Sequence, residues 1–382
     1  MARRVFLHVG PPKTGTSFLQ AAWFQHRADL AEQGVLYPGD QLLEQFRASA
    51  VALDKTRVIE RLSAGQRKAW ERLLTATQAW EGTAILSSEH WSLGSRANAA
   101  RTLERLATVA DEVHVVATAR DLARQIPAAW QQSVKQGNEE TFEEYWRSLA
   151  ADESRGFWQT QDLPQMLSRW SQGLPPERVH LVTHARPGAS KGMLWERMCE
   201  VTGVNPDILR PVARANESLG VVHVELLRRI NVELPDDRNR MDLGRLTKSF
   251  MTRDVLAPID PTTTLALPDA AHAWLDERSG AMVENLRKRG YDVVGDLTDL
   301  LPAPAPEGAR TPDSVTEAEL AALAAPAMAR MMLHEVDRRQ RERRRKRQLR
   351  HLRRTLRGSG SGDDSLPERA ARRARALLQP GR

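Results

Sequence analysis

Short runs of β-branched and aromatic residues alternate with amphipathic stretches along most of the chain. The first run covers residues 5–9, and apolar residues then recur at helical spacing over residues 18–33. The run predicts a buried strand, and the helical spacing predicts a helix that packs against it. The chain therefore opens with a strand, a short connection and a helix.

The same order of strand and helix recurs downstream. Further strands are predicted at residues 83–90, 113–121 and 178–183, with helices at 41–80, 122–136 and 193–201. Residues 34–39 and 290–297 are predicted to be a short extended piece and a strand-like turn. Strands that alternate with helices pair in parallel. We therefore expect an α/β fold with a central parallel sheet of four to five strands flanked by helices.

The connection after the first strand is rich in turn-forming and hydroxyl residues. From residue 10 to residue 17 it reads Gly-Pro-Pro-Lys-Thr-Gly-Thr-Ser. Such a turn leaves backbone N–H groups unpaired at the positive end of a helix dipole, where phosphate or sulfate oxygens bind. In nucleotide triphosphatase loops the lysine follows the second glycine, whereas here Lys13 precedes Gly15. The spacing argues against an ATPase and leaves an anion-binding loop, or a helix cap with a solvated lysine.

The segment Pro12-Lys13-Thr14-Gly15-Thr16-Ser17 resembles the 5′-phosphosulfate-binding loop of the sulfotransferases that use 3′-phosphoadenosine-5′-phosphosulfate (PAPS). The resemblance implies a P-loop-like three-layer fold and covers roughly residues 1–302. It also implies that the amides and hydroxyls of Thr14 to Ser17 hold the 5′-phosphate and the sulfate. Lys13 would neutralise charge on the bridging oxygen as the S–O bond breaks. PAPS would be the co-substrate and 3′,5′-ADP the product, and no metal is required.

A polar cluster at the end of the second long strand supplies candidates for a general base. Glu89 and His90 follow the strand at 83–90, and the carboxyl ends of parallel strands meet at one edge of a sheet, where ligands bind. A base there can take the proton of an acceptor hydroxyl or amine. We favour Glu89, with His90 second. The alternative is that Glu89 caps the next helix and His90 is a polar rim residue.

Arg120 ends the next strand, and the resemblance implies that it binds the 3′-phosphate of PAPS. In the family a serine follows about eight residues later, but here that position is Ala128. Either Arg124 or Ser133 could take its place, since a guanidinium binds phosphate in bidentate fashion. The alternative for Arg120 is an ion pair with Asp121 or Glu112.

The segment 214–220 resembles an asparagine-and-serine stretch that follows the core in many bacterial members of the family. There it contributes to the nucleotide side of the cleft, so Asn216 and Ser218 are further candidates for cofactor binding. Both residue types also cap helices, and a helix is predicted from residue 219.

An aromatic stretch at residues 141–170 has two interpretations. Its Phe, Tyr and Trp residues could line a cleft for an acceptor such as a carbohydrate or glycolipid, or could pack inward as a helical lid.

Charge is concentrated at the carboxyl-terminal end. After the domain at residues 1–302 we expect a Pro-rich linker at 303–315, a helix at 316–358 that runs into an Arg-rich segment, and a flexible basic tail at 359–382. Residues 338–358 carry twelve Lys/Arg and one Glu, a net +11, and residues 359–382 carry a net +2. Because the whole chain has a net charge of +7, residues 1–337 carry about −6. The Arg-rich segment predicts a tether to an anionic surface or polyanion, or simply a solvated helix.

The cysteine content and the apolar segments indicate in which cellular compartment the protein is expected. Cys199 is the single cysteine, which excludes an intramolecular disulfide framework and fits a reducing compartment. We expect no transmembrane segment and a cytoplasmic protein, with membrane association through the basic tail as an option.

The function predicted from sequence is transfer of a sulfuryl group from PAPS to a hydroxyl or amine of a carbohydrate, glycolipid or small metabolite. The alternatives are a P-loop kinase or NTPase-like phosphoryl transferase, and a non-catalytic polyanion-binding protein that acts through its Arg-rich tail. The acceptor and the oligomeric state are left open.

Overall fold

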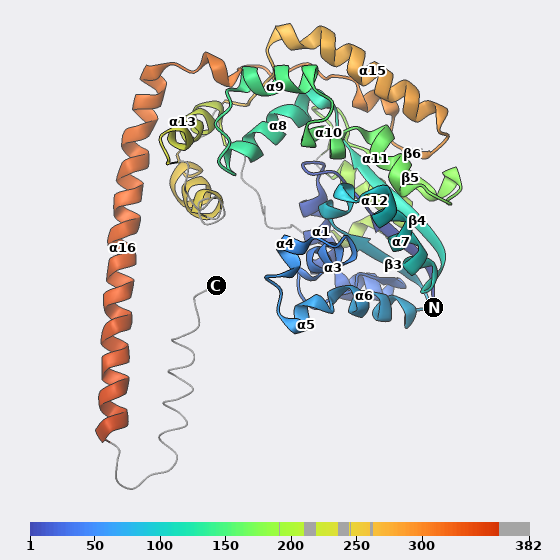
Figure 1. Cartoon of the computed structure of the whole chain (residues 1–382), viewed down its shortest axis with the longest axis horizontal. Coiled ribbons are helices and arrows are strands. Elements are labelled where there is room, and N and C mark those ends of the chain that lie inside the picture. The colour runs from blue at the N-terminus through green and yellow to red at the C-terminus, as the bar shows by residue number, and fades with distance from the viewer. Residues whose placement is uncertain (191, 210–218, 236–243, 245, 260–262, 359–382) are drawn as a thin grey trace.

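A six-stranded, all-parallel sheet forms the centre of the protein (Figure 1). The computed structural model describes residues 1–190, 192–209, 219–235, 244, 246–259 and 263–358. The strand order is β2-β3-β1-β4-β5-β6. The strands are β1 (Ala2–His8), β2 (Val35–Leu36), β3 (Thr83–Ser87), β4 (Ala110–Ala119), β5 (Val179–Thr183) and β6 (Asp292–Val294).

The predicted α/β class with a parallel sheet flanked by helices is confirmed, but the predicted number of four to five strands is wrong. The two edge strands account for the difference. β2 pairs with β3 through only two residues, and β6 pairs with β5 through three. Strands this short carry too few residues for a clear period-two pattern, so the segments 34–39 and 290–297 could not be counted as strands beforehand.

The order of the strands places a switch point at the carboxyl end of β1. From β1 the chain goes to β2 and β3 on one side of it, and then to β4, β5 and β6 on the other. His8, the last residue of β1, lies in register with Ser87 of β3 and with Val116 of β4. Ligands of open α/β sheets bind at such a point.

Helices cover both faces of the sheet because side chains alternate between the faces along each strand. Phe6, Ile85 and Val116 pack on one face with α1 (Thr16–Gln25), α2 (Arg27–Glu32) and α12 (Met193–Thr202). Leu7, Leu86 and Val115 pack on the other with α6 (Ala69–Gln78), α7 (Arg96–Ala107) and α11 (Leu163–Trp170). The result is a layer of helices on each side of the sheet.

The remaining helices surround this core. They are α3 (Glu44–Ala52), α4 (Thr56–Ile59), α5 (Ala64–Arg67), α8 (Leu122–Val134), α9 (Phe142–Ala151), α10 (Gly156–Gln161), α13 (Val221–Val232), α15 (His272–Lys288) and α16 (Glu317–Gly358), with a π-helical segment, η4 (Thr247–Leu256). Short 3-10 turns include η1 (Glu89–Leu93) and η7 (Pro312–Ser314).

The aromatic stretch from α9 to α11 packs inward. Five of its six rings are buried, namely Phe142, Tyr145, Trp146, Trp158 and Trp170, and the sixth, Phe157, is half-buried. Trp274 of α15 covers Trp146 and Trp158 with ring centroids 6.3 Å away in both cases. The interpretation as an acceptor-binding aromatic cleft is therefore wrong, because these ring faces are used by the core.

The chain after the sheet returns to the body before the long helix begins. Within the Pro-rich segment 303–315, the backbone of Arg310 forms an isolated β-bridge with Leu265. The Arg310 guanidinium forms an ion pair with Glu319 of α16 at 2.6 Å. In the part of the chain that the structure describes, no helix is long and apolar enough to cross a bilayer.

Candidate active site

The connection from β1 to α1 is a tight loop at the carboxyl end of the central strand. Lys13 and Gly15 both have the left-handed backbone conformation, with φ of 68° and 79°. A Cβ at Gly10 would lie 2.5 Å from His8 Nε2 and 2.6 Å from Thr118 Oγ1. Gly10 therefore allows the loop to approach the sheet closely, and Gly15 supplies the turn into α1 at no steric cost.

A chain of hydrogen bonds fixes this loop to three strands. Thr14 Oγ1 donates to the Pro11 carbonyl at 2.7 Å, so the second contact of Thr14 Oγ1, at 2.7 Å, is a bond that it accepts from Thr118 Oγ1. Thr118 in turn accepts from His8 Nε2 at 3.2 Å. His8 Nδ1 then accepts from Ser87 Oγ at 2.8 Å. The direction of every bond follows from the carbonyl at one end, which can only accept.

His8 is neutral in this chain. The side chain is 1% exposed, and burial lowers the pKa of His8 to about 3. A neutral ring with a proton on Nε2 and a lone pair on Nδ1 fits the two bonds described above. Sequence analysis missed His8, Ser87 and Thr118. The available signal was a polar residue at or next to the carboxyl-terminal position of a strand, directly after an apolar run.

The hydroxyls predicted to bind phosphate and sulfate differ in their surroundings. Thr14 Oγ1 is committed to Pro11 and Thr118, so it is not available to a ligand while this chain is intact. Thr16 Oγ1 is buried and has no hydrogen-bond partner among the described residues. Ser17 is exposed. No side chain caps the first turn of α1, so its leading amides are open to an anion.

The lysine and prolines of the loop contact α8 and its neighbours. Lys13 Nζ donates to Gln132 Oε1 at 2.8 Å. The Pro12 carbonyl accepts from Gln125, and from Gln161 at 3.1 Å. Glutamine side chains thus contact the loop at two points, the Lys13 ammonium and the Pro12 carbonyl.

His184 lies against the loop from the end of β5. A Cβ at Gly15 would lie 3.1 Å from His184 Nε2, an atom that is buried and has no hydrogen-bond partner within the described part of the chain. Burial, together with the nearby Arg120, Arg124 and Arg197, lowers the pKa of His184 to about 4. His184 was not predicted from the sequence, although it directly follows a strand, as Glu89 and Arg120 were predicted to do.

Arg120 has no carboxylate partner in the described residues, so the predicted alternative of an ion pair with Asp121 or Glu112 is wrong. Asp121 instead caps α8 by accepting from the Arg124 amide at 3.0 Å and pairs with its guanidinium. Glu112 pairs with His114 and Arg178. Burial and the neighbouring Arg124 lower the pKa of Arg120 to about 10. Within the described residues no carboxylate forms an ion pair with Arg120, although the charge of Asp121 acts to raise the pKa of Arg120.

A cavity of about 210 Å³ opens beside Arg120. Arg124 and Ala128, both on α8, line it on one side, and the segments 264–267 and 303–306 line it on the other. One terminal nitrogen of Arg124 is buried and has no hydrogen-bond partner among the described residues. Arg120, Arg124 and the position of the missing serine thus share one cavity.

Ser133 lies elsewhere. It is near the carboxyl end of α8, eleven residues beyond Leu122, which corresponds to roughly 16 Å along a helix. Its hydroxyl donates to the Trp130 carbonyl at 2.8 Å and accepts from Asn138 at 3.1 Å. The structure brings Arg124, and not Ser133, together with Arg120.

Glu89 and His90 start η1, directly after β3. Ser88 caps this turn, so Glu89 is not the cap. Glu89 is half-buried, and no described residue forms a hydrogen bond with its carboxylate. The rings of His90 and Phe46 pack in a T-shaped arrangement with centroids 4.6 Å apart, and burial lowers the pKa of His90. His90 Nδ1 is buried and without a partner among the described residues.

Two predicted residues, Asn216 and Ser218, lie outside the described residues. Within the described part of the chain, no group of three or more His, Cys, Asp or Glu is arranged to hold a metal ion.

No family model matches the chain, and no curated protein matches it. Among solved structures, a sulfotransferase from Alicyclobacillus acidocaldarius is similar over 61% of this chain and 94% of its own, with 15% identity and a TM-score of 0.33. A likeness of this size carries no argument about the activity of this protein.

Proposed function

We propose that the protein is a PAPS-dependent sulfotransferase. The observation that carries the proposal is the presence of two separate cationic features at one edge of the sheet. The first is the loop of Lys13 with the uncapped start of α1. The second is Arg120 with the unpaired nitrogen of Arg124. A donor with a 5′-phosphosulfate and a separate 3′-phosphate carries two anionic groups that such a pair of features would bind.

The two features are close because β4 extends past β1. Val116 of β4 is in register with His8, the last residue of β1. The strand β4 continues beyond this point to Ala119, beside the loop that follows β1. Thr118 touches Thr14 at 2.7 Å, and Arg120 is two residues further on, about 7 Å along an extended chain. In the proposed complex, Lys13 and the amides of residues 14–17 hold the phosphosulfate, while Arg120 and Arg124 hold the 3′-phosphate.

The proposed reaction is a displacement at sulfur. The acceptor oxygen or nitrogen forms a bond to sulfur, the bond from sulfur to the bridging phosphate oxygen breaks, and the acceptor proton passes to a base. Lys13 stabilises the charge that develops on the leaving phosphate, as preorganised positive groups do in a site shielded from water. Glu89 is our first choice as the base because the residue is only half-buried and no described residue forms a hydrogen bond with its carboxylate. His90 is the second.

The acceptor is an alcohol or amine of unknown identity. The burial of the aromatic stretch removes the feature that suggested a sugar ring, so carbohydrate, glycolipid and small-metabolite acceptors are equal candidates.

A phosphoryl transferase is the competing proposal. In such enzymes an acid that follows a neighbouring strand holds Mg²⁺. Asp121 follows β4, but both of its oxygens are engaged with Arg124, and the residue is fully buried. This arrangement favours the sulfotransferase proposal over a kinase.

Titration calorimetry separates the two proposals. We expect 3′,5′-ADP to bind the protein without added metal, and ATP with Mg²⁺ to bind at least tenfold more weakly. Tighter binding of ATP with Mg²⁺ would support phosphoryl transfer instead. Incubation with sulfur-labelled PAPS and an extract of the source cells, followed by identification of the labelled product, then tests the transfer and reveals the acceptor.

A further inference from the structure

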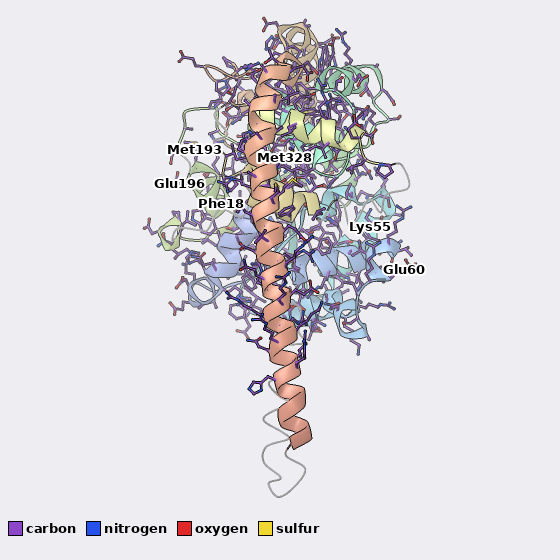
Figure 2. All side chains as sticks on the ribbon, turned by 90° about the vertical axis from the view of Figure 1, so that its left-hand side faces the viewer. Phe18, Lys55, Glu60, Met193, Glu196 and Met328 are labelled. Carbon is purple, nitrogen blue, oxygen red and sulfur yellow. The ribbon has the colours of Figure 1, made fainter. Side chains whose placement is uncertain are left out.

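Helix α16 packs against the body through only part of its length. Leu320, Leu323 and Ala327 are buried against the neighbouring helices, and the ring of His334 meets Phe250 of η4 at 4.3 Å. From Arg338 onward nearly all described side chains of α16 are exposed. Figure 1 shows the helix at one edge of the molecule, and Figure 2 shows its far end reaching beyond the body.

A cluster of apolar side chains on α16 faces solvent. Within nine residues, the exposed fractions are 58% for Met328, 39% for Met331, 71% for Met332, 66% for Leu333 and 49% for Val336. These are half of the ten large apolar side chains that are exposed in the described residues. Figure 2, viewed from the side of α16, shows Met328 on the helix in front of the body. Clustering on this scale marks an interaction surface.

Cations continue the same face of the helix. Residues three and four apart on a helix share a face, and one such series is formed by Met328, Met332, Val336, Arg339, Arg343, Lys346 and Arg350, which we call the outer stripe. Arg339 pairs with Glu335 and Lys346 with Glu342. Among the described residues, no carboxylate pairs with Arg343 or Arg350. The outer stripe is thus apolar at one end and cationic at the other.

We propose that the outer stripe docks on a lipid membrane that contains anionic lipids. Apolar side chains can enter the boundary of the acyl chains while Lys and Arg contact anionic headgroups, which is the composition of a helix that lies in a membrane interface. Residues 338–358 supply a net charge of +11, the complement of an anionic leaflet. Docking would hold the candidate active site near the membrane surface.

Two other occupants explain less of the surface. A nucleic acid would engage the cations but leave the Met, Leu and Val side chains in water, and α16 carries no Phe, Tyr or Trp to stack on bases. A second copy of the chain could cover the apolar cluster, but it would bring another strongly cationic helix close to the first. An anionic membrane satisfies both ends of the outer stripe.

The test is sedimentation of the full chain with vesicles, either of phosphatidylcholine alone or of an equal mixture with phosphatidylserine. We expect binding only to the mixed vesicles, weakened by salt. Replacing three cations of the outer stripe, Arg343, Lys346 and Arg350, by Gln should lower affinity on the order of a hundredfold. Replacing Met328, Met332 and Val336 by Gln should lower it at least about tenfold.

Matched controls change exposed residues of the same types on the body. Leu42→Gln with Leu43→Gln removes exposed apolar side chains, and Arg57→Gln, Lys68→Gln and Arg96→Gln remove three exposed cations. Both controls should bind vesicles like the unchanged protein. Circular dichroism and titration with 3′,5′-ADP check that each variant is folded, and they keep this test separate from the proposed function.

Four outcomes would overturn the proposal. The first is an unchanged protein that does not bind mixed vesicles, and the second is an apolar variant that binds them with full affinity. The third is a concentration-dependent dimer in light scattering that the apolar variant abolishes, which would assign the surface to a second copy. Duplex DNA bound more tightly than vesicles, and equally by the apolar variant, would assign it to nucleic acid.

Discussion

The carboxyl edge of the sheet and the helix α16 both gather positive charge, but in opposite environments. At the sheet edge, Arg120 and Lys13 are held by neighbouring elements, and His8 and His184 are kept neutral by burial. On α16 the cations from Arg338 to Lys346 are exposed to solvent, and among them Arg339 and Lys346 pair with carboxylates of the same helix. Where water is excluded, a single charge therefore interacts strongly with one bound group. Where water and salt screen the charges, each interaction is weak, and binding depends on many charges together.

The largest expected effect comes from the base. Glu89→Gln keeps the shape of the side chain but removes its proton affinity, so we expect a loss of turnover of about 10²- to 10⁴-fold. Binding of PAPS, followed by titration calorimetry, should stay unchanged. Glu81→Gln, on an exposed residue before β3, is the control. Near-normal turnover of Glu89→Gln together with inactive His90→Gln would move the role to His90.

Lys13→Ala tests the charge at the loop. Removing a group that stabilises charge only in the transition state should lower turnover about 10²- to 10³-fold. The melting temperature should change little, because the loop is fixed by the chain through Thr14, Thr118 and His8. Lys68→Ala, on an exposed lysine of the body, should alter neither quantity. A large loss of stability with unchanged turnover per folded molecule would contradict the proposed role.

Arg120→Gln tests the second cationic feature. We expect affinity for 3′,5′-ADP to fall about 10- to 100-fold, since hydrogen bonds to charged groups contribute about 1.5 to 3 kcal/mol. Affinity for adenosine 5′-phosphate, which lacks the 3′-phosphate, should change less than twofold. Equal losses for both ligands in calorimetry would show that Arg120 does not bind the 3′-phosphate.

His8 makes stability depend on pH. Its pKa is about 3 in the folded protein, below the model-peptide value of 6.5, so between these values the unfolded chain binds a proton that the folded chain does not. The free energy of unfolding therefore falls as the pH drops from about 6.5, by up to about 1.4 kcal/mol per pH unit for this group. In urea titrations across this range, the free energy of unfolding of His8→Gln should depend less steeply on pH than that of the unchanged protein. His272→Gln, which changes an exposed histidine, is the control and should keep the original dependence.

The smallest effect is expected on α16. Arg343→Gln with Arg347→Gln should change the free energy of unfolding by less than about 0.5 kcal/mol, because both side chains are exposed. Urea titration of the double variant measures this. A loss as large as that from a buried substitution at the sheet edge would mean that the two regions do not differ as described.

Sequence patterns predicted the features that depend on neighbouring residues. The strand-loop-helix of residues 5–33 and the strands near 83–87, 113–119 and 179–183 follow from local period and propensity. The positions of Glu89 and Arg120 at the carboxyl edge follow from a general rule about parallel sheets. The edge strands and the inward packing of the aromatic stretch did not follow, because two or three residues show no period and an aromatic helix can face either way.

By itself the sequence determined the class of fold, the turn at Gly10 to Gly15 and the uneven distribution of charge, since these depend on composition and local spacing. Only the tertiary structure decided that His8 meets Ser87 and Thr118, which lie 79 and 110 residues away. It also decided that Asp121 forms its ion pair with Arg124 and not with Arg120. The physical reason is that such contacts depend on the order and register of the strands, which no local pattern records.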